Sequence, residues 1–201
     1  MILIVAVGST AAGTPVPTDL AGRLPLQVFD HRDYEGGGQN WAITFDDRGV
    51  VWVANNAGVL EYDGQRWRTH EVPNGAVVRS LASHRGTLYV GLDGDLGHLR
   101  PTANDDVEYV SLATDLPDSM RDFRDVWGIL TSDRGVWFYT RDHVFRRNLD
   151  GSFVGWKGNF HQCFVRDGDL VARDRDRGLV RIGRDEVLRE VPGGDRFVTT
   201  R

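Results

Sequence analysis

Histidine is the side chain that most often binds metals or transfers protons near neutral pH, and here the histidines have no catalytic spacing. The chain holds six: His31, His70, His84, His98, His143 and His161. No two lie four residues apart, as a helical metal site needs, and the sequence lacks HExxH, GxSxG, GxGxxG and a phosphate-binding loop. We therefore expect no catalytic residue, no metal site and no cofactor.

Two aspartate-rich segments have the first ligands of a calcium loop, Asp93-x-Asp95-x-Gly97 and Asp174-x-Asp176-x-Gly178. A calcium loop needs an oxygen ligand at position 5 and a glutamate at position 12. Both segments carry glycine at position 5, and neither has the glutamate. We interpret them as turns in which aspartate accepts hydrogen bonds from nearby backbone amides.

Cys163 is the only cysteine, so no disulfide can form within the chain. Its neighbours Phe160 and Phe164 predict a buried, unreactive thiol. The formal net charge of −5 argues against nucleic acid as a partner, since such proteins usually carry a basic face.

A repeat defines the elements that would position any site. Each unit starts with a large apolar residue and ends in a polar turn closed by glycine, after which an apolar strand follows. Aligned without gaps, the four copies are WAITFDDRG from Trp41, VRSLASHRG from Val78, WGILTSDRG from Trp127 and FHQCFVRDG from Phe160.

Each unit continues through a second turn, a third strand, a third turn and a fourth strand. The closing glycines recur at spacings near the roughly 40 to 45 residues of a propeller blade. We predict an all-β fold, an incomplete β-propeller of about four four-stranded antiparallel blades in residues 24–201. The predicted blades cover about 41–76, 77–123, 124–158 and 159–196, with a further strand starting at 197.

The pattern stops inside that further strand, which predicts a truncated propeller. An open last blade exposes an unpaired edge, so we expect the isolated chain to be marginally stable or to self-associate. Residues 1–23 combine an apolar run with small residues and prolines. We interpret them as a signal-peptide remnant and lead-in, with a disordered or strand-like leader as the alternative.

In a four-stranded up-and-down blade, the second-to-third turns and the blade connections share one end of the ring. A small polar ligand could be held by the polar groups of these turns, and the alternative is that tight turns simply require such residues. The candidate binding residues are Asn55, Asn56, Asp93, Asp95, Arg141, Asp142, Arg173 and Asp174, with Arg175 and Asp176 beside them.

The tryptophans recur at fixed repeat positions. Trp41 and Trp127 share one position, while Trp52 and Trp137 share another, which predicts packing between blades. Trp67 and Trp156 lie near fourth strands and are the candidates for a sugar-stacking platform.

The segment QNWAITFDDRGVVWVANNAGVLEYDG from Gln39 resembles the two-component-regulator propeller repeat of large bacterial sensor proteins. The resemblance continues through PNGAVVRSLA from Pro73, LYVGLDGDLGHL from Leu88 and RDFRDVW from Arg121, and covers about 175 residues of the 201. It implies an extracytoplasmic, ligand-sensing domain of a longer, membrane-anchored and dimeric protein. Its ligand would be a small polar molecule, such as a carbohydrate, or a protein.

Two other functions stay open beside the sensor. A protein-interaction propeller would bind its partner along the rim. A propeller lyase or glycosidase would need further groups, since a glycosidase uses two carboxylates at a defined separation, and no such pair stands out in this sequence.

Overall fold

The computed structural model describes residues 2–5, 26–103 and 106–199. Apart from four 3-10 turns, every regular element in this part of the chain is a β-strand. Four four-stranded antiparallel sheets follow one another along the sequence. The all-β prediction of four-stranded blades is therefore confirmed.

The first two blades are consecutive meanders. Blade 1 holds β3 (Asn40–Phe45), β4 (Val51–Asn55), β5 (Gly58–Tyr62) and β6 (Trp67–His70). Blade 2 holds β7 (Val78–His84), β8 (Thr87–Leu92), β9 (Leu96–Pro101) and β10 (Val107–Ser111).

The last two blades repeat the order. Blade 3 holds β11 (Gly128–Ser132), β12 (Gly135–Tyr139), β13 (His143–Arg147) and β14 (Phe153–Lys157). Blade 4 holds β15 (Phe160–Arg166), β16 (Asp169–Asp174), β17 (Gly178–Ile182) and β18 (Leu188–Glu190). The 3-10 turns are η2 (Pro73–Gly75), η3 (Ala113–Asp115), η4 (Asp118–Met120) and η5 (Gly194–Phe197).

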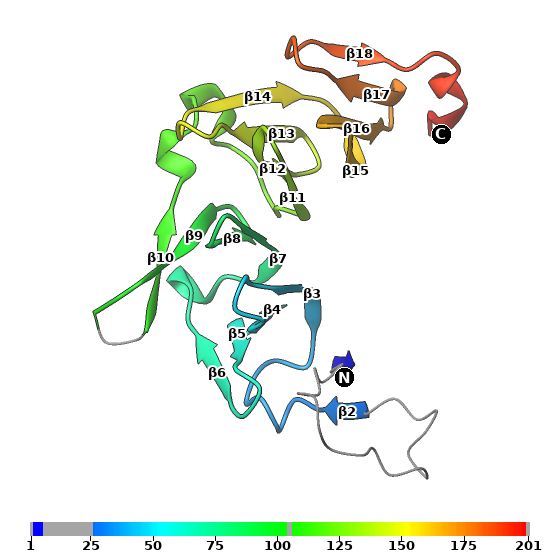
Figure 1. Cartoon of the computed structure of the whole chain (residues 1–201). Helices are drawn as coiled ribbons and strands as arrows, with labels where there is room; N and C mark the ends of the chain where they lie inside the picture. Colours follow the sequence, from blue (N-terminus) through cyan, green and yellow to red (C-terminus); the bar gives the residue numbers. More distant parts are fainter. Residues whose placement is uncertain (1, 6–25, 104–105, 200–201) are drawn as a thin grey trace, which may run out of the picture.

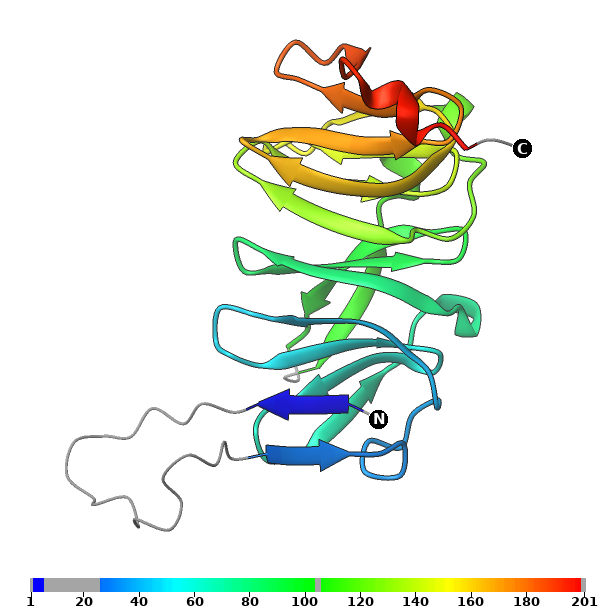
Figure 2. The same cartoon turned by 90° about the vertical axis from the view of Figure 1, so that its right-hand side faces the viewer.

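The blades lie along an arc whose concave side carries the first strand of each blade, β3, β7, β11 and β15 (Figure 1). Viewed from the side, the sheets are stacked one above another with their turns at the two ends of the strands (Figure 2). This is the arrangement of consecutive propeller blades, in which each sheet buries its faces on its neighbours.

The two-residue turns between first and second strands explain the closing glycine of the repeat in two of the blades. Arg85 and Gly86 have φ values of 51° and 76°, and Asp167 and Gly168 have 53° and 80°. A type I′ hairpin turn requires positive φ at both central residues, and glycine adopts it most easily. Hairpin geometry therefore accounts for the closing glycine in blades 2 and 4, whereas Gly135 of blade 3 is the first residue of β12 and Gly49 of blade 1 lies in a longer turn.

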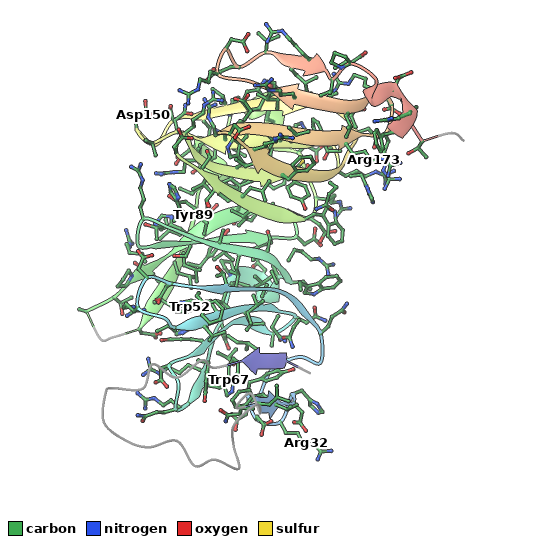
Figure 3. All side chains as sticks on the ribbon, turned by 45° about the vertical axis from the view of Figure 1, so that its right-hand side comes forward. Arg32, Trp52, Trp67, Tyr89, Asp150 and Arg173 are labelled. Atoms are coloured by element: carbon green, nitrogen blue, oxygen red, sulfur yellow. The ribbon has the colours of Figure 1, made fainter. Side chains whose placement is uncertain are left out.

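Apolar clusters fill each space between blades. Trp52, 3% exposed, packs between blades 1 and 2, and Trp137, 0% exposed, packs between blades 3 and 4. Phe138 and Phe145 fill the space between blades 2 and 3. Figure 3 shows Trp52 and Tyr89 within the stack, while Arg173 lies at its margin beside the C-terminal segment.

The opposite face of blade 1 is covered by the segment before it. Strand β1 (Ile2–Val5) pairs with β2 (Leu26–Phe29), and Phe29 and Tyr34 pack on Val53 and Leu60 of the blade. Most of the predicted lead-in at 1–23 falls outside the described residues. The further strand predicted from residue 197 begins at the last residue of η5. Residues 200–201 of that predicted strand also lie outside the described residues.

Candidate functional site

The second-to-third turns bind the blade connections through backbone hydrogen bonds. Asn56 N donates to Gln39 O at 3.3 Å, Asp93 N to Val77 O at 3.3 Å, and Arg175 N to Asn159 O at 2.8 Å. In blade 3 the turn accepts instead of donating: Gly158 N, in the connection from blade 3 to blade 4, donates to Asp142 O at 3.0 Å. These turns and connections together form one end of the arc, which we call the turn face.

In blades 1, 2 and 4 a β-bulge places one residue of the inner strand outside the ladder at this face. Register shifts between Asn40 and Ala42, Val78 and Ser80, and Phe160 and Gln162 leave the residue between them unpaired. Gly128 pairs with Tyr139 just as Ala42 pairs with Ala54, so Trp127 holds the matching place in blade 3. We call these residues the bulge positions: Trp41, Arg79, Trp127 and His161.

Three of the bulge positions converge although they come from different blades. The Arg79 guanidinium carbon lies 4.0 Å from the Trp41 ring centroid and 5.2 Å from the Trp127 centroid. The two indoles are 6.2 Å apart and tilted by 66°. A guanidinium held over indole faces is attracted by the ring quadrupole, so blades 1 to 3 share one cation–π cluster.

Polar partners fix this cluster in place. Arg79 Nε donates to Asp125 Oδ1 at 2.6 Å, and Trp41 Nε1 donates to Asn56 Oδ1 at 2.7 Å. Trp127 nevertheless remains 45% exposed. An indole exposed to this extent beside oriented polar groups can stack on a flat ring of a ligand.

His161 occupies the same place in blade 4 and contacts Arg173. Arg173 Nη1 lies 3.3 Å from His161 Nδ1, while Arg173 Nε donates to Phe197 O at 3.0 Å. The turn face is therefore aromatic over blades 1 to 3 and basic over blade 4.

The gapless alignment of the repeat missed Arg79 and His161. It placed Val78 and Phe160 at the positions of Trp41 and Trp127, but these two side chains are 0% and 2% exposed and belong to the core. The copies were aligned on the closing glycine, which lies inside the two-residue turn in blades 2 and 4 (Gly86 and Gly168) but is the first residue of β12 in blade 3 (Gly135). The inner strands are therefore offset by one residue in that alignment.

The predicted packing between blades is confirmed for Trp52 and Trp137, and Trp41 packs against the core between blades 1 and 2. Trp127 contacts Arg79 and Trp41 of other blades but stays 45% exposed on the turn face.

Two of the sequence-predicted binding residues are buried inside the turns. Asn55, 0% exposed, accepts from Gly37 N and Ala57 N and donates to Gly37 O. Asp174, 1% exposed, accepts from Asn159 N and from the side chain of Arg177. Both bind the blade connection to the turn.

The electrostatics of Asp174 follow from these contacts. Burial raises its pKa, but the Arg177 guanidinium and three backbone N–H donors outweigh that effect and hold the pKa below the usual aspartate value. The carboxylate is therefore kept charged within the turn, although it is almost inaccessible to solvent.

The other predicted residues lie on the turn face with varied surroundings. Asn56 holds Trp41, and Asp95 accepts from Leu96 N and Ser111 Oγ. Thr140 Oγ1 donates to Asp142. Asp93, Arg141, Asp142 and Asp176 are exposed and Arg175 is half-buried.

The candidate stacking platforms on the fourth strands are packed against the protein. Trp67 stacks on Tyr62 with centroids 4.8 Å apart, and Trp156 stacks on Trp137 at 5.6 Å. Trp127 thus offers a freer indole than either. Within residues 2–5, 26–103 and 106–199, no three His, Cys, Asp or Glu side chains are placed to share a metal ion.

Cys163 is 2% exposed in the core between blades 3 and 4, and burial raises the pKa of its thiol to about 12. Because the thiolate is the reactive form, we expect 5,5′-dithiobis(2-nitrobenzoate) at pH 8 to leave the folded chain unmodified over an hour. The same reagent in 6 M guanidinium chloride should label one thiol within minutes. Fast labelling of the folded chain would show that this core opens.

No family model matches the sequence, and no curated protein matches it. Among solved structures, the extracellular domain of a putative hybrid two-component system from B. thetaiotaomicron superimposes with a TM-score of 0.62 at 16% identity, over 84% of this chain and 27% of that chain. A streptogramin B lyase gives 0.60 at 14% identity, over 82% and 56%. A catalytically inactive virginiamycin B lyase variant from Staphylococcus aureus, with quinupristin, gives 0.54 at 16%, over 75% and 54%.

This chain thus spans about half the length of the lyases and about a quarter of the sensor domain. Among its described residues, no helix is both long and apolar enough to cross a bilayer. The fold is that of consecutive propeller blades, shared with two-component sensor domains and with lyases, as the sequence resemblance implied.

Proposed function

We propose that this chain is a non-enzymatic ligand-binding propeller of an extracytoplasmic bacterial sensor, and that it holds a small polar ligand on the turn face. The observation that carries the proposal is the exposed Trp127 indole beside Arg79, Asn56 and Asp125. Stacking on an indole combined with hydrogen bonds from fixed polar groups suits a sugar ring or another flat polar molecule.

The fold comparison supports a sensory role. Extracellular domains of two-component systems are built from the same blades. We accordingly place the chain outside the cytoplasm, within a longer, membrane-anchored and dimeric receptor whose output domain transmits the signal. No nucleic acid is expected among its partners, because the chain is acidic overall.

Isothermal titration calorimetry with neutral tetrasaccharides and with the acidic trisaccharide trigalacturonate tests the binding site. For the tightest-binding saccharide we expect Trp127→Ala to weaken affinity about tenfold, equivalent to about 1.4 kcal/mol of lost stacking. Leu149→Ala is the control, because Leu149 is 54% exposed in the β13–β14 turn. Equal affinity of Trp127→Ala and the wild type would show that the indole does not contribute to ligand binding.

A double substitution tests whether exposed residues of the second-to-third turns contribute to ligand binding. Asn56→Ala with Asp93→Ala alters exposed side chains and leaves the buried Asn55 unchanged, so the fold should be retained. We expect weaker ligand binding, because Asn56 orients Trp41. Binding equal to that of the wild type would mean that these turn residues serve the hairpins alone.

Lyase activity is the alternative function, since two lyases share the fold. Incubation with quinupristin followed by chromatography should leave the compound unchanged. A new product peak that requires the folded chain would assign this protein a lyase activity and contradict the non-enzymatic proposal.

A further inference from the structure

The part of the turn face formed by blade 4 has a cation without a carboxylate partner. Arg173 donates from Nε to Phe197 O at 3.0 Å and from Nη2 to Thr199 Oγ1 at 3.1 Å, and its Nη1 lies 3.3 Å from His161 Nδ1. None of these three partners is a carboxylate. No carboxylate among the described residues forms an ion pair with Arg173, so its charge is oriented but not compensated.

A second cation, Arg141, lies in the turn between β12 and β13 of blade 3. The backbone of Arg141 accepts a hydrogen bond from Phe160 N at 2.6 Å, which places its turn directly beside His161. Arg141 is exposed, and within the described part of the chain it has no ion-pair partner.

The aspartates of the neighbouring turns, all among the described residues, have other hydrogen-bond partners, and none of them forms an ion pair with Arg173 or Arg141. Asp174 is buried and paired with Arg177 at 2.7 Å. Asp176 accepts from Asn159 Nδ2 at 3.1 Å, and Asp142 accepts from Thr140 Oγ1 at 2.9 Å. Over blade 2 the situation is the reverse, because Arg79 is neutralised by Asp125 at 2.6 Å.

The blade that carries these cations is the neighbour of the blade that carries the exposed indole. Trp127, directly before β11, matches the place of His161 on β15, and β11 and β15 are neighbouring inner strands. A ligand ring lying against Trp127 therefore has basic groups along the side that faces blade 4. An arginine with its guanidinium fixed in this way favours a carboxylate, since charge-assisted hydrogen bonds are stronger than neutral ones.

We infer that Arg173, His161 and Arg141 form an anion subsite that binds the carboxylate of a ligand whose ring lies against Trp127. The inference rests on the proposed function and narrows its ligand to a flat ring bearing a carboxylate. Two sources have this chemistry, a uronic acid residue of an oligosaccharide and an aromatic carboxylic acid.

Calorimetry on the full chain with four probes tests the inference. Trigalacturonate is compared with its fully methyl-esterified form, and benzoate with benzamide. We expect the acid of one pair to bind at least about tenfold more tightly than its neutral counterpart. That preference should shrink when salt is raised from 50 to 300 mM, because exposed charges are screened.

Arg173→Gln should abolish the preference for the acid, and Arg173→Lys should retain part of it. The matched control is Arg166→Gln, which removes the same charge from the far end of β15, where the side chain is 79% exposed. Thermal melting of each variant shows whether the fold is intact before binding is compared.

Preference for trigalacturonate identifies a uronic acid ligand, and preference for benzoate identifies an aromatic acid. Equal binding of the acid and neutral forms, or an unchanged preference in Arg173→Gln, overturns the anion subsite and leaves the proposed function standing. Failure of all four probes, together with failure of the neutral tetrasaccharides, overturns both.

Discussion

Asn55→Ala is expected to lower the free energy of unfolding by about 3 kcal/mol, because it removes several buried hydrogen bonds at once. The side-chain amide donates to Gly37 O at 2.7 Å, Gln39 O at 3.1 Å and Asn40 Oδ1 at 2.6 Å. Its oxygen accepts from Gly37 N and Ala57 N, both at 2.8 Å. Alanine leaves these groups without their partner in a site that is 0% exposed.

Urea unfolding followed by tryptophan fluorescence measures the effect. The control is Asn56→Ala, the adjacent but exposed position, which should cost less than about 1 kcal/mol. Asn55→Asp should fall between them, since a carboxylate keeps the acceptor role but cannot donate. If Asn55→Ala and Asn56→Ala unfold at the same urea concentration, Asn55 does not hold the blade connection.

Asp169→Ala is expected to destabilise the chain by about 3 kcal/mol, because it removes the negative charge from a buried ion-pair network between blades 3 and 4. Asp169 is 4% exposed and lies 2.7 Å from Arg181 Nε and 3.6 Å from Arg134 Nη1. Burial lowers the pKa of Arg134, and so does the neighbouring Arg146. Without Asp169, this half-buried cation loses the nearest charge that compensates it.

The matched control is Asp167→Asn, two residues away, because Asp167 has a φ of 53° and asparagine tolerates this left-handed conformation. Asp167 has the same charge, but its side chain is 87% exposed and its ion pair with Arg166 spans 3.5 Å. Exposed pairs of this kind contribute about 0 to 1 kcal/mol. Equal unfolding midpoints for the two variants would mean that the network adds nothing to the interface between the blades.

The strands and turns of this fold could be predicted from the sequence because their signals are local. Two-residue turns need positive φ, so Arg85-Gly86 and Asp167-Gly168 mark hairpins in the sequence itself. Burial of both faces explains the apolar second strands such as Val51–Asn55. Here each local preference agrees with the fold.

The site was harder to predict, because its signals depend on tertiary structure. An asparagine in a turn looks the same in sequence whether it binds solvent or a buried connection, so Asn55 and the exposed Asn56 could not be distinguished. Arg79 and His161 were missed because the closing glycine, on which the copies were aligned, does not hold the same place in every hairpin. Only the pairing of Ser80 with Gly91 and of Gln162 with Arg173 reveals their place.

The bulges allow one strand both to fill the core and to present a side chain on the turn face. A bulged residue lies outside the ladder, while its neighbours Val78 and Phe160 fill the core. Exchanging Arg79 or His161 therefore alters what the turn face presents and leaves Val78 and Phe160 in the core, whereas Trp41 also packs against the core between blades 1 and 2. Over evolutionary time, a receptor built from such blades can acquire a new specificity through changes at these few positions while its fold is inherited intact.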